Sequence, residues 1–408
     1  MVCDFDLPAL LSIVIPTRNR TPYAISAIES ILEIPDRRLE LVVQDNSDSC
    51  DLRAHVEANV KDPRCRYRYT PPPLSLIDNF NAALEMATGE YVCLIGDDDG
   101  VNPEIMQAAA WAKANEIDCV AMRPTASYVW QGSGIPSTLF TKAPGGTLSV
   151  SASRGGVKEV DLERELRKFV RDGGTRYLKF SLPRLYHGLV HRRCLSAVRE
   201  KTGAYLGGLT PDAFASVAVA CVARRLVVTD YPLTLPGACS VSGTVVEGVL
   251  KRHSKKLDDA PHLRHRGVYH WCELVPRVYT PYAIWADSAV AALRAMGRDD
   301  LVGQLNLPKL AAQVGGADRS NALPVLQALF MGLRIMRKNR AMGAACLASA
   351  LITCHGGAFV CRAWNRFLVM TGMRASERID GLTNMVEASH ALSRHLQGRE
   401  RSFARYIS

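Results

Sequence analysis

Residues 78–103 read DNFNAALEMATGEYVCLIGDDDGVNP, which joins a helix-like segment, an apolar segment and three consecutive acids. Apolar side chains recur three and four residues apart in the first part, and this spacing predicts a helix that begins near residue 78. We expect Gly89 to end that helix in the left-handed conformation. Tyr91–Ile95 is a short apolar run, typical of a strand buried on both faces, and Asp97–Asp99 follow it directly.

The rest of the first 125 residues repeats this alternation of strand and helix. Apolar runs predict further strands at Leu11–Pro16, Leu39–Val43 and Ile117–Met122, and Arg66–Tyr69 is a further candidate strand. Segments with helical spacing separate these runs. The alternation predicts the α/β class, with a Rossmann-like, mostly parallel sheet flanked by helices.

Polar side chains follow three of the predicted strands, at Thr17–Arg20, Asp45–Asp48 and Asp97–Asp99. Ligands bind at the carboxyl ends of the strands in such sheets, so we expect the three clusters to share one crevice. Three adjacent carboxylates repel one another, and a divalent cation with hard oxygen ligands, Mg²⁺ or Mn²⁺, offsets that repulsion. A solvated acidic turn is an equally good interpretation of these acids taken alone.

Composition narrows the class of protein. The 408 residues include 50 Lys and Arg against 40 Asp and Glu, and this excess of +10 suits phosphates, a membrane surface or nucleic acid. The charge is spread along the chain and no nucleic-acid motif occurs, so we expect no nucleic-acid partner. The twelve cysteines are scattered without a C-x-x-C pair, and the N-terminus lacks the basic region of a secretory signal. We therefore expect a cytoplasmic protein.

Common nucleotide-binding and hydrolase motifs are missing from the sequence. There is no G-x-x-x-x-G-K-[ST], no G-x-G-x-x-G and no G-x-S-x-G. These absences remove the main support for a P-loop kinase, a dinucleotide-binding enzyme and an α/β-hydrolase.

Four segments in order resemble a family 2 glycosyltransferase with its GT-A fold. They are IPTRNR at Ile15–Arg20, VVQDNSD at Val42–Asp48, the segment 78–103, and TPDAF at Thr210–Phe214. The resemblance covers roughly residues 10–240. It implies a metal-dependent, inverting transfer of a sugar from a nucleotide-diphosphate sugar to an acceptor hydroxyl.

The resemblance also implies roles for individual residues. The donor would contact Pro16, Thr17, Arg18, Asn19, Asp45, Asn79, Asp97 and Asp98, with Asp45 accepting hydrogen bonds from the base. The base is typically uracil or a related pyrimidine, so the resemblance favours a UDP-sugar and leaves thymine and guanine donors open. The metal, Mn²⁺ or Mg²⁺, would be held by Asp99 and Asp97. Gly96 stands where many members have the first acid of the motif, which leaves the division of roles among the three acids open.

Asp212 matches the catalytic base, which would take the proton of the acceptor hydroxyl. The alternative is a plain acid at the start of a helix. His187, Arg252 and His253 could contact the acceptor or the phosphates, against the alternatives of a structural histidine and a solvated basic loop. Arg18 and Arg20 could likewise reach phosphate or form surface ion pairs.

The sequence also suggests a domain map. We expect a catalytic domain at 1–240, with a nucleotide-sugar half at 10–125 and an acceptor half at 126–240. A basic linker at 241–269 and a helical region at 270–408 would follow. Within the acceptor half, residues 123–175 lack periodicity and predict an irregular insertion with one helix at Asp161–Val170.

Two features of the C-terminal region bear on membranes. Residues 341–361 carry no charge apart from His355, and we favour a buried helix pair over a membrane span because glycines and alanines dominate. The basic end from Arg362 to Arg405 suits either anionic lipids at the inner face of the membrane or an ordinary solvated face. Lipid contact would suit a lipid-linked acceptor; a free glycan is the other acceptor class.

Two other functions remain to be distinguished from glycosyl transfer. A nucleotidyltransferase would usually carry a glycine-rich loop after the first strand, and IPTRNRTP contains no glycine. A non-catalytic sugar-nucleotide or membrane-surface binding protein would not need to keep Asp45, the three acids and Asp212 together.

Overall fold

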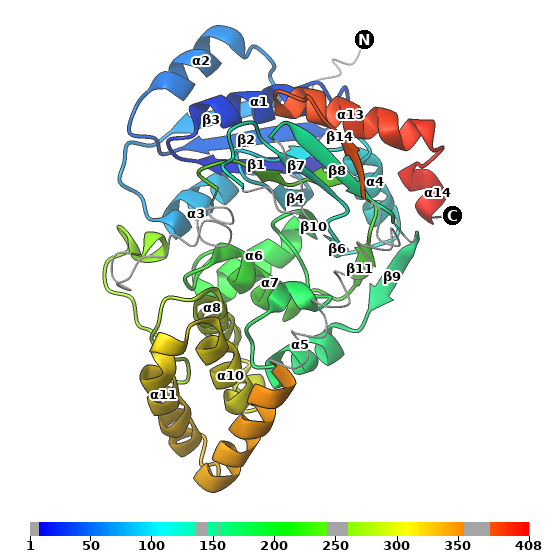
Figure 1. Ribbon diagram of the computed structural model, residues 1–408. Helices are drawn as coiled ribbons and strands as arrows, with labels where there is room; N and C mark the ends of the chain where they lie inside the picture. Colours follow the sequence, from blue (N-terminus) through cyan, green and yellow to red (C-terminus); the bar gives the residue numbers. More distant parts are fainter. Residues whose placement is uncertain (1–7, 136–144, 154, 243–259, 355–375, 408) are drawn as a thin grey trace.

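The computed structural model describes residues 8–135, 145–153, 155–242, 260–354 and 376–407 (Figure 1). An eight-stranded sheet forms its centre, with the spatial order β3-β2-β1-β4-β10-β6-β11-β9. Listed in chain order, these strands are β1 (Leu11–Thr17), β2 (Leu39–Asp45), β3 (Cys65–Tyr69), β4 (Tyr91–Leu94), β6 (Cys119–Met122), β9 (Val157–Val160), β10 (Gly188–His191) and β11 (Leu226–Thr229).

The first four strands of the sheet are parallel, as the alternation predicts. β1 pairs in register with β2 and with β4, and β2 pairs with β3. Every residue of β1, β2 and β4 is buried, which explains their continuous apolar sequences. The predicted mostly parallel α/β class with a helical C-terminal region is confirmed.

One strand that the sequence did not predict lies inside this sheet. β10 inserts antiparallel between β4 and β6, and it carries His187 to the carboxyl end of β4. β11 is parallel to β6, and β9 closes the edge antiparallel to β11.

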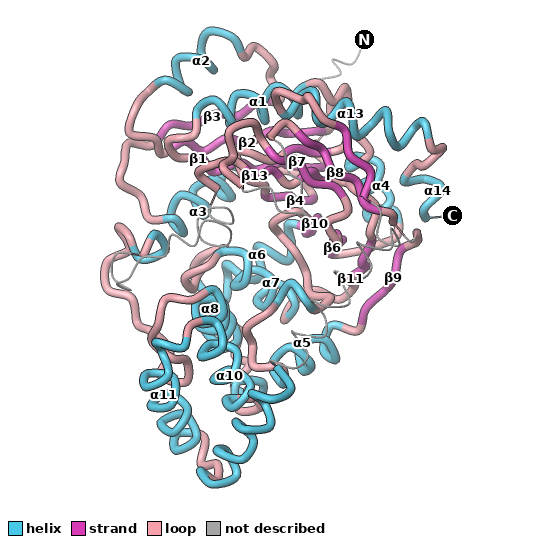
Figure 2. The backbone as a smooth tube through the Cα atoms, viewed as in Figure 1, coloured by secondary structure: helices cyan, strands magenta, loops and turns pink. Residues whose placement is uncertain are grey.

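Helices cover both faces of the sheet (Figure 2). One apolar core holds side chains of α1, α4 and α13, and the other holds side chains of α3, α5, α6, α7 and α8. The helices of the sheet domain are α1 (Thr21–Leu32), α2 (Asp51–Asn59), α3 (Leu76–Met86), α4 (Ile105–Ala114), α5 (Leu162–Arg171), α6 (Arg192–Thr202) and α7 (Pro211–Ala220), with a 3-10 turn η1 (Tyr177–Lys179).

Gly89 does not have the predicted left-handed conformation. α3 ends at Met86 with the extended residue Ala87 as its C-cap, and Gly89 is not among the positive-φ residues. Gly89 instead allows two backbone segments to lie close together, because a Cβ atom here would lie 2.5 Å from the backbone nitrogen of Ser12. The glycine lets the chain entering β4 pass against β1.

The predicted irregular insertion at 123–175 is in fact partly regular. It contributes β7 (Ala126–Val129) and β8 (Thr147–Ser151), which join a second sheet of order β13-β7-β8-β14, together with β9 and the predicted helix, observed as α5. The remaining short strands are β5 (Gly100–Val101), β12 (Thr234–Leu235), β13 (Gly237–Ala238) and β14 (Ser376–Ile379). The sequence of residues 123–175 therefore lacks periodicity because its strands are short and have one exposed face, and not because its backbone is irregular.

The predicted helical region at 270–408 divides into two parts. The first is a helical lobe whose apolar side chains continue the core under α7. It contains α8 (Pro281–Ala295), α9 (Asp299–Val302), α10 (Leu307–Ala317), η5 (Arg319–Asn321) and α11 (Ala322–Ile335), followed by helical residues 340–354. The short 3-10 turn η4 (Pro261–Leu263) precedes this region, in the predicted linker.

The second part returns to the sheet domain. β14 pairs antiparallel with β8, α13 (Met385–Gly398) packs on α1, and α14 (Phe403–Ile407) lies against α4 (Figure 1). Residues 376–407 thus belong with the sheet and not with the helical lobe, because their apolar side chains pack in the core that also holds α1 and α4. No helix in the described ranges is both long enough and apolar enough to cross a bilayer.

Candidate functional site

The carboxyl ends of β1 and β4 meet at Asp97. Thr17 Oγ1 donates a hydrogen bond of 2.6 Å to Asp97 Oδ2, and Arg20 Nη1 lies 3.0 Å from Asp97 Oδ1. The Arg20 guanidinium also lies 3.6 Å from Asp98. Two of the three predicted clusters therefore form one site, and Arg20 balances part of its negative charge.

Asp99 is held by protein donors on both carboxylate oxygens. Oδ1 accepts from the Gly237 amide at 2.7 Å, and Oδ2 accepts from the Gly96 amide at 2.6 Å and from the Tyr186 hydroxyl at 3.0 Å. His187 Nε2 lies 3.1 Å from Oδ2. These contacts, with that histidine the largest favourable influence, hold the pKa of Asp99 below its usual value despite the opposing effect of burial.

Gly96 cannot carry the acid that many family members have at its position. A Cβ atom there would lie 2.6 Å from the Tyr186 hydroxyl, 2.9 Å from Asp99 Oδ2 and 3.0 Å from Asp98 Oδ1. The space of that side chain is taken by Tyr186, which explains the departure of the GDDD sequence from the family pattern.

Asp98 has the open carboxylate of the three acids. Its Oδ2 atom is buried and has no hydrogen-bond partner, and its main-chain oxygen accepts from Trp130 Nε1 at 2.8 Å. Burial, reinforced by Asp99 and Asp97, raises the pKa of Asp98 to about 7. Burial likewise raises the pKa of Asp97. A cation at this point would satisfy the open oxygen and favour the charged form.

These side chains fit a divalent cation shared with phosphates. Among the described residues, no three His, Cys, Asp or Glu side chains form a ready-made metal cage. Mg²⁺ commonly takes only one or two carboxylates and completes its shell with water and substrate phosphates. Asp98 Oδ2 meets that requirement as the structure stands, whereas Asp99 would first have to give up hydrogen bonds.

The second cluster adjoins the first through Asn19, and Asn79 of α3 joins the first cluster. Asn79 Nδ2 donates to the Thr17 main-chain oxygen at 3.2 Å, and its own Oδ1 is buried without a partner. Asn19 donates to Asp48 at 2.6 Å and receives a bond from the Asp48 amide. The carboxyl ends of β1 and β2 thereby form one continuous rim, as the topology predicts.

Asp45 lies fully buried at the end of β2. Its oxygens accept from the Tyr67 hydroxyl at 2.7 Å and from the Ser47 amide at 2.8 Å. Arg18 pairs with Asp48 at 3.2 Å, and both side chains are substantially exposed. Of the two alternatives expected for Arg18, a phosphate contact or a surface ion pair, the structure has the surface ion pair. Pro16 lies within β1, one residue before Thr17.

Asp212 occupies the first turn of α7 and does not cap it. Its carboxylate accepts a hydrogen bond from Tyr177, whose ring stacks edge-on against Trp285 at 5.7 Å. Thr210 is the N-cap residue by position, but its hydroxyl bonds to Ser288 instead of the helix. Asp212 is thus a partly exposed acid held in place by a buried tyrosine, and this tyrosine was not recognised in the sequence.

The segment from Tyr177 to His187 touches both acidic centres. Tyr177 contacts Asp212 at one end, and Tyr186 and His187 contact Asp99 at the other. His187 has a positive φ of 57°, and its Nδ1 is buried without a partner. The sequence RLYHGLVH offered one recognisable signal, a histidine before an apolar run. The contribution of the tyrosines depends on contacts across the sheet.

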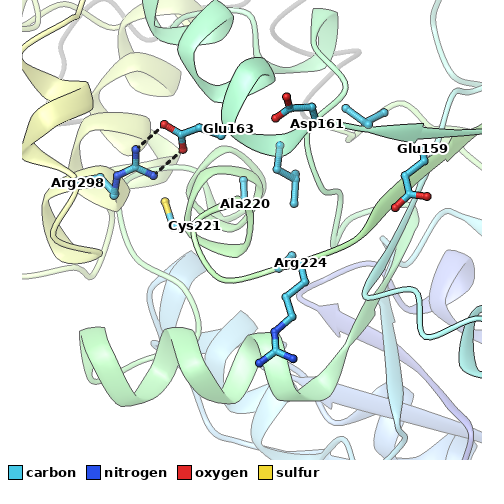
Figure 3. Close-up of a pocket in the computed structure, with 10 residues that line it drawn as sticks. Glu159, Asp161, Glu163, Ala220, Cys221, Arg224 and Arg298 are labelled. Carbon is cyan, nitrogen blue, oxygen red and sulfur yellow. Dashed lines mark hydrogen bonds and ion pairs between the residues drawn. The ribbon is translucent and has the colours of Figure 1, made fainter.

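Arg252 and His253 lie outside the described residues, as does the rest of the basic run 251–256. An open hollow beside α5 lies elsewhere in the molecule. It has a volume of about 560 Å³, and its lining includes Glu163, Cys221 and Arg298 (Figure 3). None of the predicted site residues lines it.

Ligands of mostly parallel α/β sheets bind at the carboxyl ends of the strands, which is where these buried acids lie. Residues 12–179 match the family described as "Glycosyl transferase family 2". The resemblance to a family 2 glycosyltransferase that the motif order predicts is confirmed over these residues.

Two curated bacterial proteins share part of this domain. One is the GalNAc(5)-diNAcBac-PP-undecaprenol beta-1,3-glucosyltransferase of Campylobacter jejuni, 35% identical over 115 residues, which are 26% of this chain and 35% of that protein. The other is the putative colanic acid biosynthesis glycosyl transferase WcaA of Escherichia coli, 34% identical over 96 residues, 23% of this chain and 34% of that protein. The chain spans about a third of the length of the curated relatives it matches.

Solved structures with a related arrangement include Staphylococcus aureus TarS residues 1–349 in complex with UDP-GlcNAc. That structure is 13% identical, with a TM-score of 0.46 over 85% of this chain and 92% of TarS 1–349. The Pyrobaculum calidifontis mannosyltransferase PcManGT, in complex with GDP-Man and Mn²⁺, is 15% identical with a TM-score of 0.37, over 86% and 88% of the two chains.

Proposed function

We propose that the protein is a metal-dependent, inverting glycosyltransferase that acts in cell-surface glycan biosynthesis. It would transfer a sugar from a nucleotide-diphosphate sugar to an acceptor hydroxyl. The observation that carries this proposal is the buried, unpartnered Asp98 Oδ2 at the carboxyl edge of a family 2 domain, beside Asp97, Thr17 and Arg20. An open carboxylate buried beside an arginine suits a cation bound to a phosphorylated ligand.

The donor would lie along the rim formed by the ends of β1, β2 and β4. Asp45 would accept from the base, and Asn79 Oδ1 is a second acceptor without a protein partner. The proposal of a UDP-sugar rests on the family resemblance. The Arg20 guanidinium lies within 3.6 Å of both Asp97 and Asp98, and it would pair with the diphosphate when the donor binds.

The metal would be held by Asp98, with Asp97 or Asp99 joining after exchange of a hydrogen bond. This revises the expectation that Asp99 and Asp97 are the ligands. A bound Mn²⁺ or Mg²⁺ supplies charge neutralisation on the diphosphate leaving group. Asp99 would instead fix the turn and His187, because its oxygens already accept from Gly96, Gly237 and Tyr186.

Asp212 would act as the base that takes the acceptor proton as the hydroxyl attacks the sugar. Its hydrogen bond from Tyr177 fixes the carboxylate, and its partial exposure leaves room for an acceptor. Attack opposite the leaving group gives inversion without a covalent intermediate. A glycan or a lipid-linked acceptor is proposed because the names of the two curated relatives describe an undecaprenol-linked glycan and colanic acid. A cytoplasmic location accompanies this proposal.

The first test is a thermal-shift panel of UDP, dTDP, GDP, ADP and CMP, each with Mn²⁺, Mg²⁺ or EDTA. A ligand at about 100 times its Kd adds roughly 2.7 kcal/mol to the unfolding free energy. We expect one nucleoside diphosphate to stabilise the protein only with metal.

A turnover assay then distinguishes the three candidate functions, which are glycosyl transfer, nucleotidyl transfer and binding without catalysis. Incubation with the matching sugar nucleotide and an acceptor extract should release a nucleoside diphosphate, and Asp212→Asn should abolish the release. Asp161→Asn is the matched control, because Asp161 is also an acid at a helix start, where it caps α5. Release of pyrophosphate would indicate nucleotidyl transfer. Binding with no turnover, unchanged in Asp212→Asn, would indicate a binding protein.

A further inference from the structure

The helix α11 is apolar on its outward face as well as its inward face. Val325, Leu329 and Leu333 are buried against the lobe. Four further apolar side chains, spread over the rest of the helix surface, are exposed to solvent by 66, 38, 55 and 46%, respectively: Leu323, Leu326, Met331 and Ile335. Single exposed apolar residues are ordinary, but four large ones on one helix are not.

The helical residues 340–354 extend this apolar surface. They contact the lobe mainly through Gly343, Leu347 and Ala350, and Gly343 packs directly against Leu333. The other side chains face outward, including Met342 and Ile352, which are 67% and 75% exposed. Seven of the ten large, exposed apolar side chains in the described residues lie between positions 323 and 352. They are concentrated on one pair of helices and not scattered.

Charge on the same helix pair has a single sign. The sequence from 319 to 354 contains no Asp or Glu, although acids make up 40 of the 408 residues. Arg334, Arg337 and Arg340 are exposed at the end of α11 and the turn that follows. The Arg340 guanidinium lies over the Phe330 ring, 5.4 Å from its centroid, so cationic and apolar groups are interleaved.

We propose that α11 and residues 340–354 form a docking face for an anionic lipid bilayer. Apolar side chains would enter the headgroup boundary while the arginines contact lipid phosphates. A second copy of the chain fits less well, because a symmetric contact would bring the same positive charges together. The docking face lies at the end of the helical lobe away from the sheet (Figure 1).

This location differs from the one expected from the sequence. Arg362, Arg366 and Arg374 of the basic end lie outside the described residues. Arg399 and Arg405, in the returning segment, pair with Glu377 and Glu400. The proposal goes beyond glycosyl transfer and does not depend on it.

Vesicle flotation of the full chain tests the proposal. We expect binding to vesicles of phosphatidylcholine with 30% phosphatidylglycerol, weaker binding in 0.5 M salt, and little binding to phosphatidylcholine alone. Arg334→Gln/Arg337→Gln should lower the partition coefficient by about 25-fold, because each basic residue contributes roughly fivefold near such a surface. Met331→Gln/Ile335→Gln should lower it by about tenfold or more at unchanged salt dependence.

Matched substitutions elsewhere control for net charge and apolarity. Lys61 and Arg192 are exposed basic residues of the sheet domain, and Leu178 and Val268 are exposed apolar residues outside the helix pair. Lys61→Gln/Arg192→Gln and Leu178→Gln/Val268→Gln should leave vesicle binding within about twofold of the parent. Circular dichroism and melting curves establish that all four variants fold.

Three outcomes would overturn the proposal. The first is no binding to anionic vesicles by the folded parent. The second is equal loss of binding in the control and docking-face variants. The third is a dimer in light scattering that the Met331→Gln/Ile335→Gln variant converts to monomer, together with unchanged vesicle binding, which would assign the face to a second copy.

Discussion

The Tyr186 hydroxyl donates a 3.0 Å hydrogen bond to Asp99, from a strand-leading segment that is 87 residues away in sequence. Tyr186 precedes β10, which inserts between β4 and β6, so the bond ties the inserted strand to the acidic turn after β4. The same hydroxyl occupies the space where a Cβ atom on Gly96 would lie. Together with the Asp98 and Asp99 carboxylates, this tyrosine therefore limits which residue can stand at the head of the acidic motif.

Gly96→Ala should destabilise the protein by about 1–3 kcal/mol, the usual range for overpacking a filled site. The new Cβ would lie 2.6 Å from the Tyr186 hydroxyl. Tyr186→Phe removes that oxygen, so the double variant should recover part of the loss. Urea unfolding of both single variants and the double variant measures the coupling. Strictly additive losses would contradict the assigned contact.

The metal-free protein should become less stable as the pH rises from about 4 to about 7. Burial, with Asp99 and Asp97 nearby, raises the pKa of Asp98 to about 7, so the folded state holds a proton that the unfolded state has already released. The contribution of protonated Asp98 to the free energy of unfolding is fully present below the pKa of Asp98 in the unfolded state. It is lost as the pH rises through the pKa of Asp98 in the folded state. Urea midpoints at pH 5, 6, 7 and 8 in EDTA measure the slope.

Asp98→Asn should flatten that pH dependence, since the amide does not titrate. Saturating Mn²⁺ should flatten it in the parent protein as well, because a cation favours the charged carboxylate. If Asp98→Asn keeps the full slope, Asp98 is not the group that titrates.

Asp98→Asn and Asp99→Asn should fail in different ways. Asp98 has the open oxygen, so its amide variant should lose the metal-dependent shift with nucleotide while remaining folded. Asp99 accepts from two backbone amides and Tyr186, so its variant should lose stability, by roughly 1–3 kcal/mol. Isothermal titration with Mn²⁺ and a nucleoside diphosphate, together with urea unfolding, separates the two effects. The reverse pattern would indicate that Asp99, and not Asp98, binds the metal.

Tyr177→Phe should lower kcat by about tenfold and leave the donor KM nearly unchanged. The substitution removes the hydrogen bond that holds Asp212 but keeps a ring to stack on Trp285. Steady-state kinetics with varied donor at saturating acceptor make the measurement. An increase in the donor KM with unchanged kcat would place Tyr177 in donor binding instead of base positioning.

Gly89→Ala and Gly89→Asn should both destabilise the protein. A left-handed helix end would accept asparagine, whereas a close backbone contact accepts no Cβ atom at all. The contact with Ser12 predicts loss in both variants, measured as a drop in melting temperature. Tolerance of asparagine alone would restore the helix-end interpretation.

The sequence contained enough information for the parallel half of the sheet and for the polar rim. Strands buried on both faces, such as β1 and β2, have continuous apolar sequences, and parallel connection brings their ends together. Thr17 and Asp97 could thus be assigned to one site before any geometry was known, whereas Asn79 was assigned to it through the family resemblance. Arg20 was recognised only as a candidate for phosphate or a surface pair.

The sequence did not show which strands pair with partners that are distant along the chain. β10 has four residues and begins with a glycine, so no local pattern distinguishes it from a loop. β14 pairs with β8 across more than 220 residues, and its residues are mostly exposed. The open oxygen on Asp98 depends on which neighbours satisfy Asp97 and Asp99, and those neighbours come from three separate segments.

The insertion of β10 also determines when the protein can fold during its synthesis. β4 and β6 leave the ribosome first, but they do not pair with each other, and the strand that bridges them ends only at His191. A nascent chain that stops at residue 125 exposes two unpaired strand edges in the middle of its future sheet, which invites association with other chains. Translation must therefore pass the bridging strand before the donor rim acquires its final shape.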